Sequence, residues 1–391
     1  MSKINNQTGP PVEGDDFFGR TKELDFAWKH IKKGNSIILS APRRVGKSSF
    51  AKKLLVKAKD EGWNTFEINL EEIKSEIGFV NLFVEKFQNQ SWWDEIKTKS
   101  KEKLEQLLTS IKPSFEYEGA KATLEWQSKK ADVYEKLKQL IDHQKDTLIM
   151  VDEVTILLNS LLEDKENGIQ NVTFFLNWLR SFRQISDTKI RWVFCSSIGI
   201  DNFTNQHNLS YTFNDVDSFP LGAFNEETSI ALLKSLAESD NLKMDDVLTN
   251  AIITKIGWLL PYFLQVIHYK LNYLVQVENE TLNDKTLEKA YNLLISEKHL
   301  NTWDERLKEY GSLESDARTV LKYLCKNTKG EKRGNIIEVL NQKLNDIDKA
   351  DETTSKLISM LSNDGYLAET NGRYVFRSPL IRDFWFKRFM K

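Results

Sequence analysis

Three residue types that build metal sites, disulfides and rigid turns are scarce in this chain of 391 residues: cysteine occurs twice, histidine five times and proline seven times. The two cysteines, Cys195 and Cys325, lie far apart within apolar runs, so the sequence shows neither a disulfide framework nor a zinc-ligand spacing. This usage is typical of a reducing cytosol, and we expect a cytoplasmic protein. No run approaches the roughly 18 apolar residues of a membrane span, and the polar first residues lack the apolar segment of a secretory signal.

The chain also lacks a strong charge of either sign. Its formal net charge is −2, with 29% charged and 40% hydrophobic residues. A near-neutral chain has no global basic field that would attract nucleic acid or a membrane surface, although a local patch remains allowed. The composition is that of an ordinary globular protein, and the length favours two or three domains.

The most informative stretch, from Asn35 to Val56, is NSIILSAPRRVGKSSFAKKLLV. An apolar, β-prone run is followed by a tight loop, Ala41–Ser48, and then by a helix. Strand, glycine-bearing loop and helix in this order predict the phosphate-binding loop of a nucleoside triphosphatase. Backbone N–H groups of such a loop surround the β-phosphate, and the positive end of the helix dipole points at the same anion.

Each residue type in this loop has a chemical reason. Gly46 allows a close approach of the backbone, the ammonium of Lys47 reaches the β- and γ-phosphate oxygens, and the Ser48 hydroxyl ligates Mg²⁺. The first glycine of the usual pattern is replaced by Ala41, which is a departure from the strict motif. We expect ATP or ADP to contact Ala41, Pro42, Arg43, Arg44, Val45, Gly46, Lys47, Ser48 and Ser49.

A second signal lies about 100 residues downstream, where an apolar run that begins at Thr147 ends in Asp152 and Glu153. A continuous apolar run predicts a central strand covered on both faces, and ligands bind at the carboxyl ends of such strands. This is the Walker B arrangement, in which Asp152 would hold Mg²⁺ and Glu153 would activate the attacking water as a general base.

Two further arginines, Arg180 and Arg183, lie near the end of an aromatic-rich helix predicted for residues 169–185. One interpretation is core packing with a solvated last helical turn, which favours cations. The other is contact with a γ-phosphate, in cis or from a neighbouring subunit. Between this segment and the phosphate loop, residues 71–145 carry an insertion, in which Phe115–Trp126 suggests a hairpin around Gly119.

The segment before the loop and a segment far after it point to a family. Phe17, Phe18, Gly19, Arg20 and Glu23 are similar to the hhGRxxE segment of origin-recognition and STAND ATPases. The pair Gly257 and Pro261 resembles the lid signature of STAND ATPases, with more residues between the glycine and the proline than is usual.

Taken with the loop and the Asp-Glu strand end, these segments resemble the prokaryotic archaeal-type P-loop ATPases, close to STAND and origin-recognition AAA+ proteins. The resemblance implies an α/β fold with an ASCE P-loop core, a five-stranded parallel sheet in the order 5-1-4-3-2, an α-helical lid and a C-terminal winged helix. It also implies an adenine near Phe18, Gly19 and Arg20, a lid proline at Pro261 and a sensor hydroxyl at Ser197 (or Ser196). For Pro261, the alternative interpretation is an ordinary proline at the first position of a helix. For Ser197 (or Ser196), it is an ordinary turn at the end of a strand.

The domain organisation that we expect has four parts. Residues 1–14 form a flexible leader, residues 15–222 the insertion-bearing core, residues 223–311 the helical lid and residues 312–391 the winged helix. In the last part, three short helices precede a hairpin with Asn371-Gly372 at its turn, a strong type I′ signal.

The predicted winged helix has only a weak charge bias, with 15 Lys and Arg against 11 Asp and Glu in residues 312–391. Its third helix offers a single lysine, Lys356, where a reader of base edges usually presents Arg, Asn or Gln. Docking to protein is therefore at least as well supported as DNA binding. The candidates for phosphate contact are Arg373, Arg377, Arg382, Lys387 and Arg388.

The function that the sequence favours is a slow, Mg²⁺-dependent ATPase that acts as a regulatory switch on a separately encoded effector protein, in antiphage defence or stress signalling. The alternative is a DNA-associated ATPase, a loader or transposition regulator that uses the winged helix. A scaffold that binds nucleotide without hydrolysis is a third hypothesis, which the intact Asp152-Glu153 pair disfavours. Homo-oligomerisation is left open, and no membrane partner is expected.

Overall fold

The computed structural model describes residues 4–88, 120–141, 145–196, 199–296 and 298–390. The chain forms two compact units. We call Arg20–Ser40 with Ser48–Pro220 the core unit, and Met1–Gly19, Ala41–Lys47 and Leu221–Lys391 the C-terminal unit.

The core unit contains a five-stranded parallel sheet. Its strands are β1 (Ile37–Ser40), β2 (Asn64–Asn69), β3 (Thr147–Asp152), β4 (Ile190–Cys195) and β5 (Asp217–Pro220). Their order is β2-β3-β4-β1-β5, which confirms the 5-1-4-3-2 order implied by the resemblance. β1 therefore lies between β4 and the edge strand β5, and β3 lies on the other side of β4.

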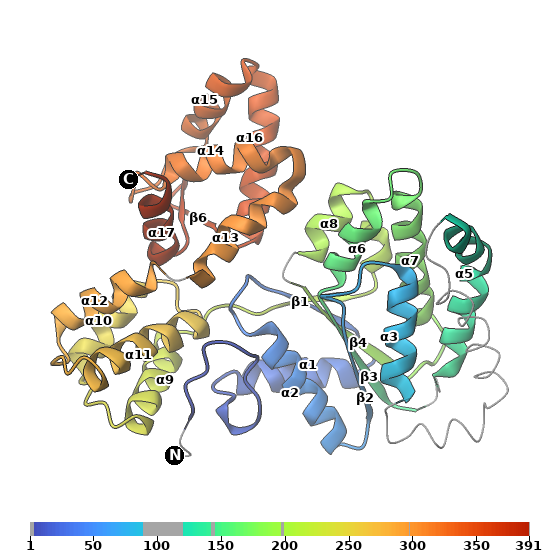
Figure 1. Cartoon of the computed structure of the whole chain (residues 1–391), viewed down its shortest axis with the longest axis horizontal. Coiled ribbons are helices and arrows are strands. Elements are labelled where there is room, and N and C mark those ends of the chain that lie inside the picture. The colour runs from blue at the N-terminus through green and yellow to red at the C-terminus, as the bar shows by residue number, and fades with distance from the viewer. Residues whose placement is uncertain (1–3, 89–119, 142–144, 197–198, 297, 391) are drawn as a thin grey trace. The chain divides into compact units, whose positions relative to one another are not determined.

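All six residues of β3 are buried, as expected for a strand with helices on both faces. Ile149 and Val151 belong to the large cluster under α3, α5, α6 and α7, whereas Leu148 and Met150 point to the opposite face. Figure 1 shows α1 and α2 on one side of the sheet and α3, α6 and α7 on the other. The helices of this unit are α1 (Thr21–Lys32), α2 (Lys47–Asp60), α3 (Glu76–Gln88), α5 (Ala120–Leu140), α6 (Val154–Leu162), α7 (Gly168–Arg183) and α8 (Ile200–Gln206).

The hairpin expected over Phe115–Trp126 is wrong where the structure describes it. Residues 120–126 begin the helix α5, which continues to Leu140, and residues 115–119 lie outside the described residues. Trp126 is buried in the aromatic core beside Tyr134, with ring centroids 6.1 Å apart. Burial of one helical face against the core outweighs the local turn signal at Gly119.

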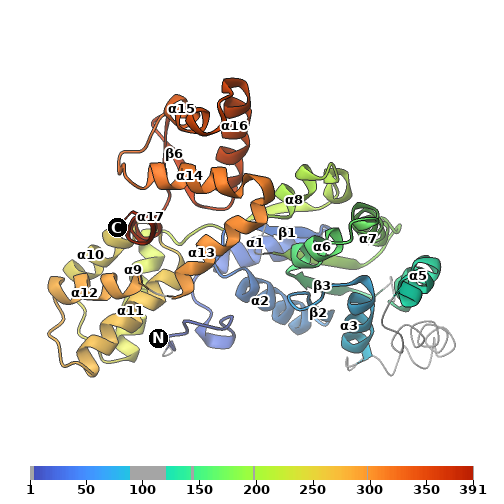
Figure 2. The same cartoon turned by 45° about the horizontal axis from the view of Figure 1, so that its top comes forward.

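The C-terminal unit begins with a group of four helices that lie side by side in Figures 1 and 2. They are α9 (Glu226–Ser239), α10 (Asp246–Ile256), α11 (Pro261–Gln276) and α12 (Asp284–Leu294). Three of them start at an N-cap whose side chain accepts a backbone N–H, namely Asn225, Asp245 and Asn283.

The chain then passes through α13 (Asn301–Glu305) to α14 (Glu314–Leu324), α15 (Arg333–Leu344) and α16 (Ile347–Asn363), which Figure 2 shows as one group. An antiparallel hairpin of β6 (Leu367–Thr370) and β7 (Arg373–Phe376) follows, and α17 (Pro379–Phe389) ends the chain. Asn371 and Gly372 both have positive φ, as a type I′ turn requires. The predicted hairpin is therefore present, and the assignment of these elements to the winged-helix class stays a prediction.

The N-terminal residues, which we expected to be a flexible leader, make hydrogen bonds within the C-terminal unit. The N–H of Ile4 donates to Ser239, and the N–H of Gln7 donates to the side chain of Gln265. In the described parts of the chain, every helix is too short or too polar to span a bilayer.

Candidate functional site

The loop between β1 and α2 has the backbone of a phosphate-binding turn. Gly46 has a φ of 93°, which a residue with a side chain rarely adopts, and Arg44 has a φ of 68°. A Cβ at Gly46 would meet no atom within 4 Å, so backbone conformation rather than space requires glycine there. Ala41 is not left-handed. The missing first glycine of the motif therefore carries no conformational strain.

Lys47, the first residue of α2, folds back over this loop. Its Nζ donates to the backbone oxygens of Ala41 at 2.7 Å and Pro42 at 3.0 Å, and the residue is only 8% exposed. A nearly buried ammonium needs acceptors, and these two carbonyl groups supply them. The charge of Lys47 is thus held at the loop into which a phosphate would bind.

The hydroxyl of Ser48 connects the start of α2 to the end of β3. Ser48 Oγ donates to Asp152 Oδ2 at 2.8 Å, across 104 positions of the sequence. The other carboxylate oxygen of Asp152 accepts the N–H of Glu153 at 3.0 Å, so both oxygens are oriented. The two residues predicted to ligate Mg²⁺ are therefore in contact, as the two motifs require.

Glu153 directly follows Asp152 and is the N-cap of α6, with a left-handed φ of 57°. Its N–H also donates to Cys195 O at 2.9 Å, which ties it to the end of β4. Ser196 Oγ donates to Glu153 Oε2 at 3.4 Å, and the Thr155 hydroxyl contacts the Ser196 hydroxyl in turn. A non-glycine residue in this conformation costs roughly 1–2 kcal/mol, and such strain is common at functional sites.

Of the two sensor candidates, Ser197 lies outside the described residues. Ser196 is 5% exposed and holds the carboxylate of Glu153. Thr155 was missed by sequence reasoning, although it is the second residue of α6 and lies only two positions after Glu153, where a hydroxyl could have been noted.

The donor set fits a hard divalent cation of the Mg²⁺ type. A serine hydroxyl and a carboxylate that touch each other offer oxygen ligands, and Mg²⁺ is usually bound by one or two carboxylates plus substrate phosphates. No group of three or more His, Cys, Asp or Glu side chains that could hold a metal by itself occurs among the described residues. A cation here would therefore need phosphate oxygens to complete its shell.

The Gly19-Arg20 segment has two successive left-handed residues, with φ of 65° and 60°. A Cβ at Gly19 would lie 2.9 Å from Thr228 Cγ2, so the close approach of α9 admits only glycine. Arg20 opens α1 within 3.5 Å of Glu23, and burial lowers the pKa of Arg20 to about 10, against the raising effect of Glu23. Arg20 stays charged at neutral pH. Phe17 and Phe18, on the other side of the glycine, are half-buried.

Comparison with solved structures finds full-length likenesses of low sequence identity. The Walker-type ATPase PABY2304 of Pyrococcus abyssi superposes with a TM-score of 0.63 at 14% identity, covering 97% of this chain and 99% of that one. The ORC2 protein of Aeropyrum pernix gives a TM-score of 0.54 at 12% identity, covering 97% and 98%. No family model and no curated protein matches the sequence.

The chain has the fold of an AAA+ P-loop ATPase. The resemblance to archaeal-type P-loop ATPases close to origin-recognition AAA+ proteins, predicted from short motifs, is thereby confirmed at the level of the fold.

In this ATPase fold, the side chains of the phosphate loop contact other parts of the C-terminal unit. The guanidinium of Arg44 lies 4.4 Å from the ring centroid of Tyr262, a cation–π contact, and burial lowers the pKa of Arg44. Tyr262 directly follows Pro261, the first residue of α11. A Cβ at Gly365 would lie 2.8 Å from Pro42 Cβ, so the turn before β6 also closely approaches the loop. Neither Tyr262 nor Gly365 was predicted as a site residue.

The two arginines of α7 have different surroundings. Arg183 is 3% exposed at its side chain and makes a bidentate pair with Asp215, both contacts at 2.9 Å. Its guanidinium also lies 5.1 Å from the Phe213 ring, and burial lowers its pKa. Arg180 lies over the exposed ring of Tyr211 at 5.7 Å. The structure thus gives Arg183 a structural role and leaves Arg180 as the arginine that faces the surface.

Replacement of Arg183 is expected to lower the free energy of unfolding rather than the catalytic activity. Arg183→Ala leaves Asp215 partly buried and unpaired, which costs about 2–3 kcal/mol, below the range for a fully buried pair because Asp215 is partly exposed. Urea unfolding measures the loss. Arg180→Ala is the matched control and should change the free energy of unfolding by less than about 0.5 kcal/mol. Equal losses in the two variants would contradict the structural role of Arg183.

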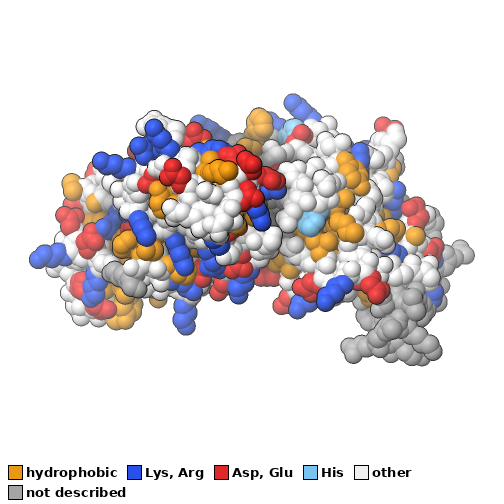
Figure 3. Space-filling model, turned by 90° about the horizontal axis from the view of Figure 1, so that it is seen from above, with side chains coloured by type: hydrophobic (Ala, Val, Ile, Leu, Met, Phe, Trp, Pro, Cys, Tyr) orange, Lys and Arg blue, Asp and Glu red, His pale blue; other side chains and the backbone are white. Residues whose placement is uncertain are grey.

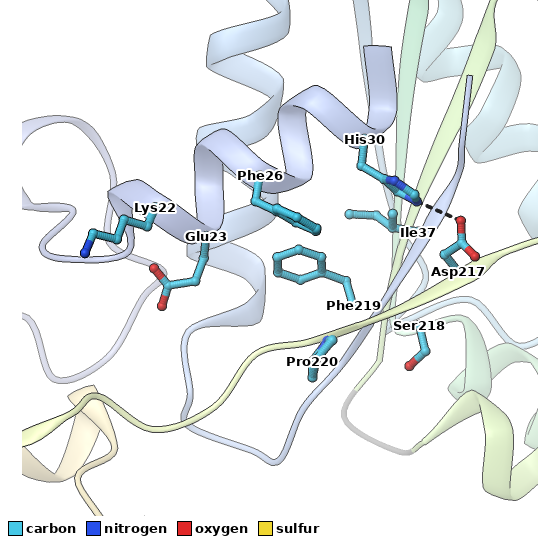
Figure 4. Close-up of a pocket in the computed structure, with 9 residues that line it drawn as sticks. All are labelled: Lys22, Glu23, Phe26, His30, Ile37, Asp217, Ser218, Phe219 and Pro220. Carbon is cyan, nitrogen blue, oxygen red and sulfur yellow. Dashed lines mark hydrogen bonds and ion pairs between the residues drawn. The ribbon is translucent and has the colours of Figure 1, made fainter. Parts of the chain in front are cut away.

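A separate hollow of about 500 Å³ lies on the core unit between α1 and β5. Figure 4 shows the ring of Phe26 facing that of Phe219, and His30 bonded to Asp217 at 2.7 Å. Ser218 also lines the hollow but points away from His30 in Figure 4, so these residues do not form a Ser-His-Asp arrangement. The contact between Ser48 and Asp152 is not part of this hollow.

Proposed function

We propose that this protein binds and hydrolyses ATP and acts as a nucleotide-operated switch on a partner protein. The observation that carries the proposal is the hydrogen bond from Ser48 to Asp152, which joins the phosphate loop's helix to the acidic strand end. The likeness to the ORC2 protein, described as ADPNP and ADP complexes, supports an adenine nucleotide as the ligand.

Binding of the triphosphate follows from the loop and from Lys47. Backbone N–H groups of the loop and the N-terminus of α2 bind phosphate oxygens, since both offer unsatisfied donors and a positive dipole end. Lys47 exchanges the carbonyl groups of Ala41 and Pro42 for the β- and γ-phosphates. Ser48 and Asp152 would hold Mg²⁺, which neutralises charge that develops on the phosphates.

Hydrolysis needs a base for the attacking water, and we assign this role to Glu153. Its carboxylate follows the Mg²⁺-binding Asp152 directly and accepts a hydrogen bond from Ser196. Because Thr155 contacts Ser196 in turn, two buried hydroxyl groups orient the carboxylate without neutralising it.

A switch also requires a part that differs between nucleotide states. We place it at the contact of Arg44 with Tyr262, because Arg44 belongs to the loop that binds phosphate and Tyr262 opens α11. The loop conformation set by the γ-phosphate would reach α11 through this contact. A separately encoded effector protein and a role in antiphage defence or stress signalling remain hypotheses from the sequence.

Hydrogen exchange of α11 in the full chain tests this proposal. With the wild-type protein, the α11 amides should exchange at different rates with ADP and with a non-hydrolysable ATP analogue. Tyr262→Leu removes the ring and should abolish this difference while weakening nucleotide binding roughly 2- to 30-fold, the equivalent of a cation–π contact of ~0.5–2 kcal/mol.

Tyr262→Phe is the matched control, since it keeps the ring under Arg44 and removes only the hydroxyl. It should retain the nucleotide-dependent exchange. If wild-type α11 exchanges identically with both nucleotides, the chain is not a switch of this kind. If Tyr262→Leu keeps the wild-type difference, the signal does not pass through Arg44.

A further inference from the structure

The strand β5 forms one edge of the parallel sheet and pairs with β1 on its inner side. Among the described strands, none pairs with its outer side. The N–H of Asp217 donates to Ser36 O at 3.0 Å, so Asp217 directs its N–H toward β1. Because successive residues of a strand alternate, the N–H and C=O groups of Ser218 point to the open edge, where Ser218 is exposed. This edge therefore offers hydrogen-bonding groups to an added strand.

The hollow beside this edge has an aromatic wall. The rings of Phe26 on α1 and Phe219 on β5 face each other with centroids 6.3 Å apart (Figure 4). Phe219 is 9% exposed and stacks on Phe50 at 5.6 Å, which holds it in the core. Phe26 is 66% exposed, more than any other aromatic side chain in the described part of the chain. An apolar side chain placed against the two rings would remove Phe26 from water, which is favourable.

The charged groups at the hollow favour a cationic partner. At one end, the carboxylate of Asp217 is bonded to His30 at 2.7 Å and its side chain is 62% exposed. At the other end lies Glu23, which also contacts Arg20 at 3.5 Å. The ammonium of Lys22 points away from the two rings in Figure 4. Carboxylates at both ends of an apolar wall complement a segment that carries a basic and an apolar side chain.

Strand geometry sets the spacing of these two side chains. Asp217 and Phe219 are two positions apart on β5 and lie on the same face of the sheet, where both meet side chains of α1. A strand added along β5 would meet them with residues that are also two positions apart. Pro220, the last residue of β5, lacks an N–H and limits the pairing to a few residues. The edge therefore fits a short extended segment.

We propose that the outer edge of β5 binds an extended peptide segment of a partner protein, with an apolar side chain against Phe26 and a Lys or Arg beside Asp217. Backbone hydrogen bonds with Ser218 supply affinity and the two side chains supply specificity, as in other strand additions to a sheet edge. Figure 3 shows basic and acidic side chains interspersed on the face that it presents, so we expect the attraction to be local to the hollow. This edge belongs to the core unit and does not include the phosphate loop, so peptide binding does not require ATP hydrolysis.

A phage-displayed library of random heptapeptides, selected on the full chain without nucleotide and counter-selected on Phe26→Ser, tests this proposal. We expect the enriched peptides to share a Lys or Arg two positions from a large apolar residue. Labelled synthetic copies should bind the wild-type chain in fluorescence anisotropy. Phe26→Ser should weaken this binding roughly 10-fold, the value for burying about half of a phenylalanine side chain.

Variants of the chain separate the contacts. Phe26→Ser should fold normally because the ring is exposed, and circular dichroism checks this. Tyr269→Ser removes an exposed ring from α11 in the C-terminal unit and is the matched control, which should bind the peptide like the wild type. Asp217→Asn keeps the shape of the edge and removes its charge, so it should weaken binding roughly 2- to 5-fold and lower the salt dependence.

Changes in the peptide test the strand geometry. Moving the basic residue next to the apolar residue puts the two side chains on opposite faces of the added strand and should weaken binding as much as Phe26→Ser does. Methylation of the peptide N–H groups, one at a time, should weaken binding roughly 2- to 10-fold at the group that donates to Ser218 O. If no methylated peptide binds more weakly, the segment is not added as a strand and the proposal fails.

Two other results would overturn the proposal: no enrichment on the wild type over Phe26→Ser, or equal binding of the selected peptides to both proteins. Sedimentation velocity of the chain alone tests a different occupant. A wild-type dimer that Phe26→Ser dissociates would assign the edge to a second copy of the chain and would contradict the proposal. Because no nucleotide is present, failure of peptide binding is distinguishable from failure of the proposed ATPase activity.

Discussion

The variant Lys47→Ala is expected to lose most of its ATP binding. The ammonium of Lys47 is nearly buried and is held at the phosphate loop by two carbonyl oxygens, so it is ready to meet phosphate oxygens when a nucleotide binds. A hydrogen bond between charged groups contributes about 1.5–3 kcal/mol, which corresponds to roughly 10- to 150-fold in affinity. Isothermal titration calorimetry with a non-hydrolysable ATP analogue measures the loss.

Lys59→Ala is the matched control for this experiment, because Lys59 lies on the same helix, α2, and is exposed near its end. Its nucleotide affinity should equal that of the wild type. Unchanged affinity in Lys47→Ala, with a folded protein, would mean that the loop does not bind phosphate and that the assignment of the nucleotide site is wrong.

The second large effect is expected in Glu153→Gln, which should bind ATP normally and hydrolyse it roughly 10²- to 10⁴-fold more slowly, the contribution of a general base. The amide keeps the shape and still accepts the hydrogen bond from Ser196, but it cannot take a proton from water. Single-turnover ATP hydrolysis measures the rate, and calorimetry on the same sample shows that binding is retained.

Glu163→Gln serves as the control, since this exposed carboxylate follows α6 and leaves Glu153 untouched. Its rate should match the wild type. If Glu153→Gln also keeps the wild-type rate, another group activates the water, and the pairing of Ser196 with Glu153 has only a structural meaning.

Lys47 and Glu153 could both be identified from the sequence alone, for a physical reason. A loop that surrounds phosphate and a buried strand that ends in two acids each need particular residue types at fixed local spacing, so a single chain reveals them. The start of α2 at Lys47 and the end of β3 at Asp152 followed the predicted patterns. Strand order is not encoded locally, and it came from the family resemblance.

Local sequence patterns did not predict the structure where packing between distant segments determines it. The glycine at position 119 suggested a hairpin, but burial of Trp126 and Tyr134 in an aromatic core places them on one face of the helix α5. Arg180 and Arg183 are equivalent in the sequence, and only the position of Asp215 makes Arg183 structural.

The sequence by itself determined that the chain carries a phosphate loop and an acidic strand end, because backbone conformation and ligand chemistry restrict those positions to a few residue types. Only the tertiary structure decided that Ser48 meets Asp152, that Thr155 and Ser196 orient Glu153, and that Arg44 contacts Tyr262. These contacts join residues far apart in the chain, and their partners are chosen by how helices and strands pack. A contact of that kind leaves no periodic or local trace in a single sequence.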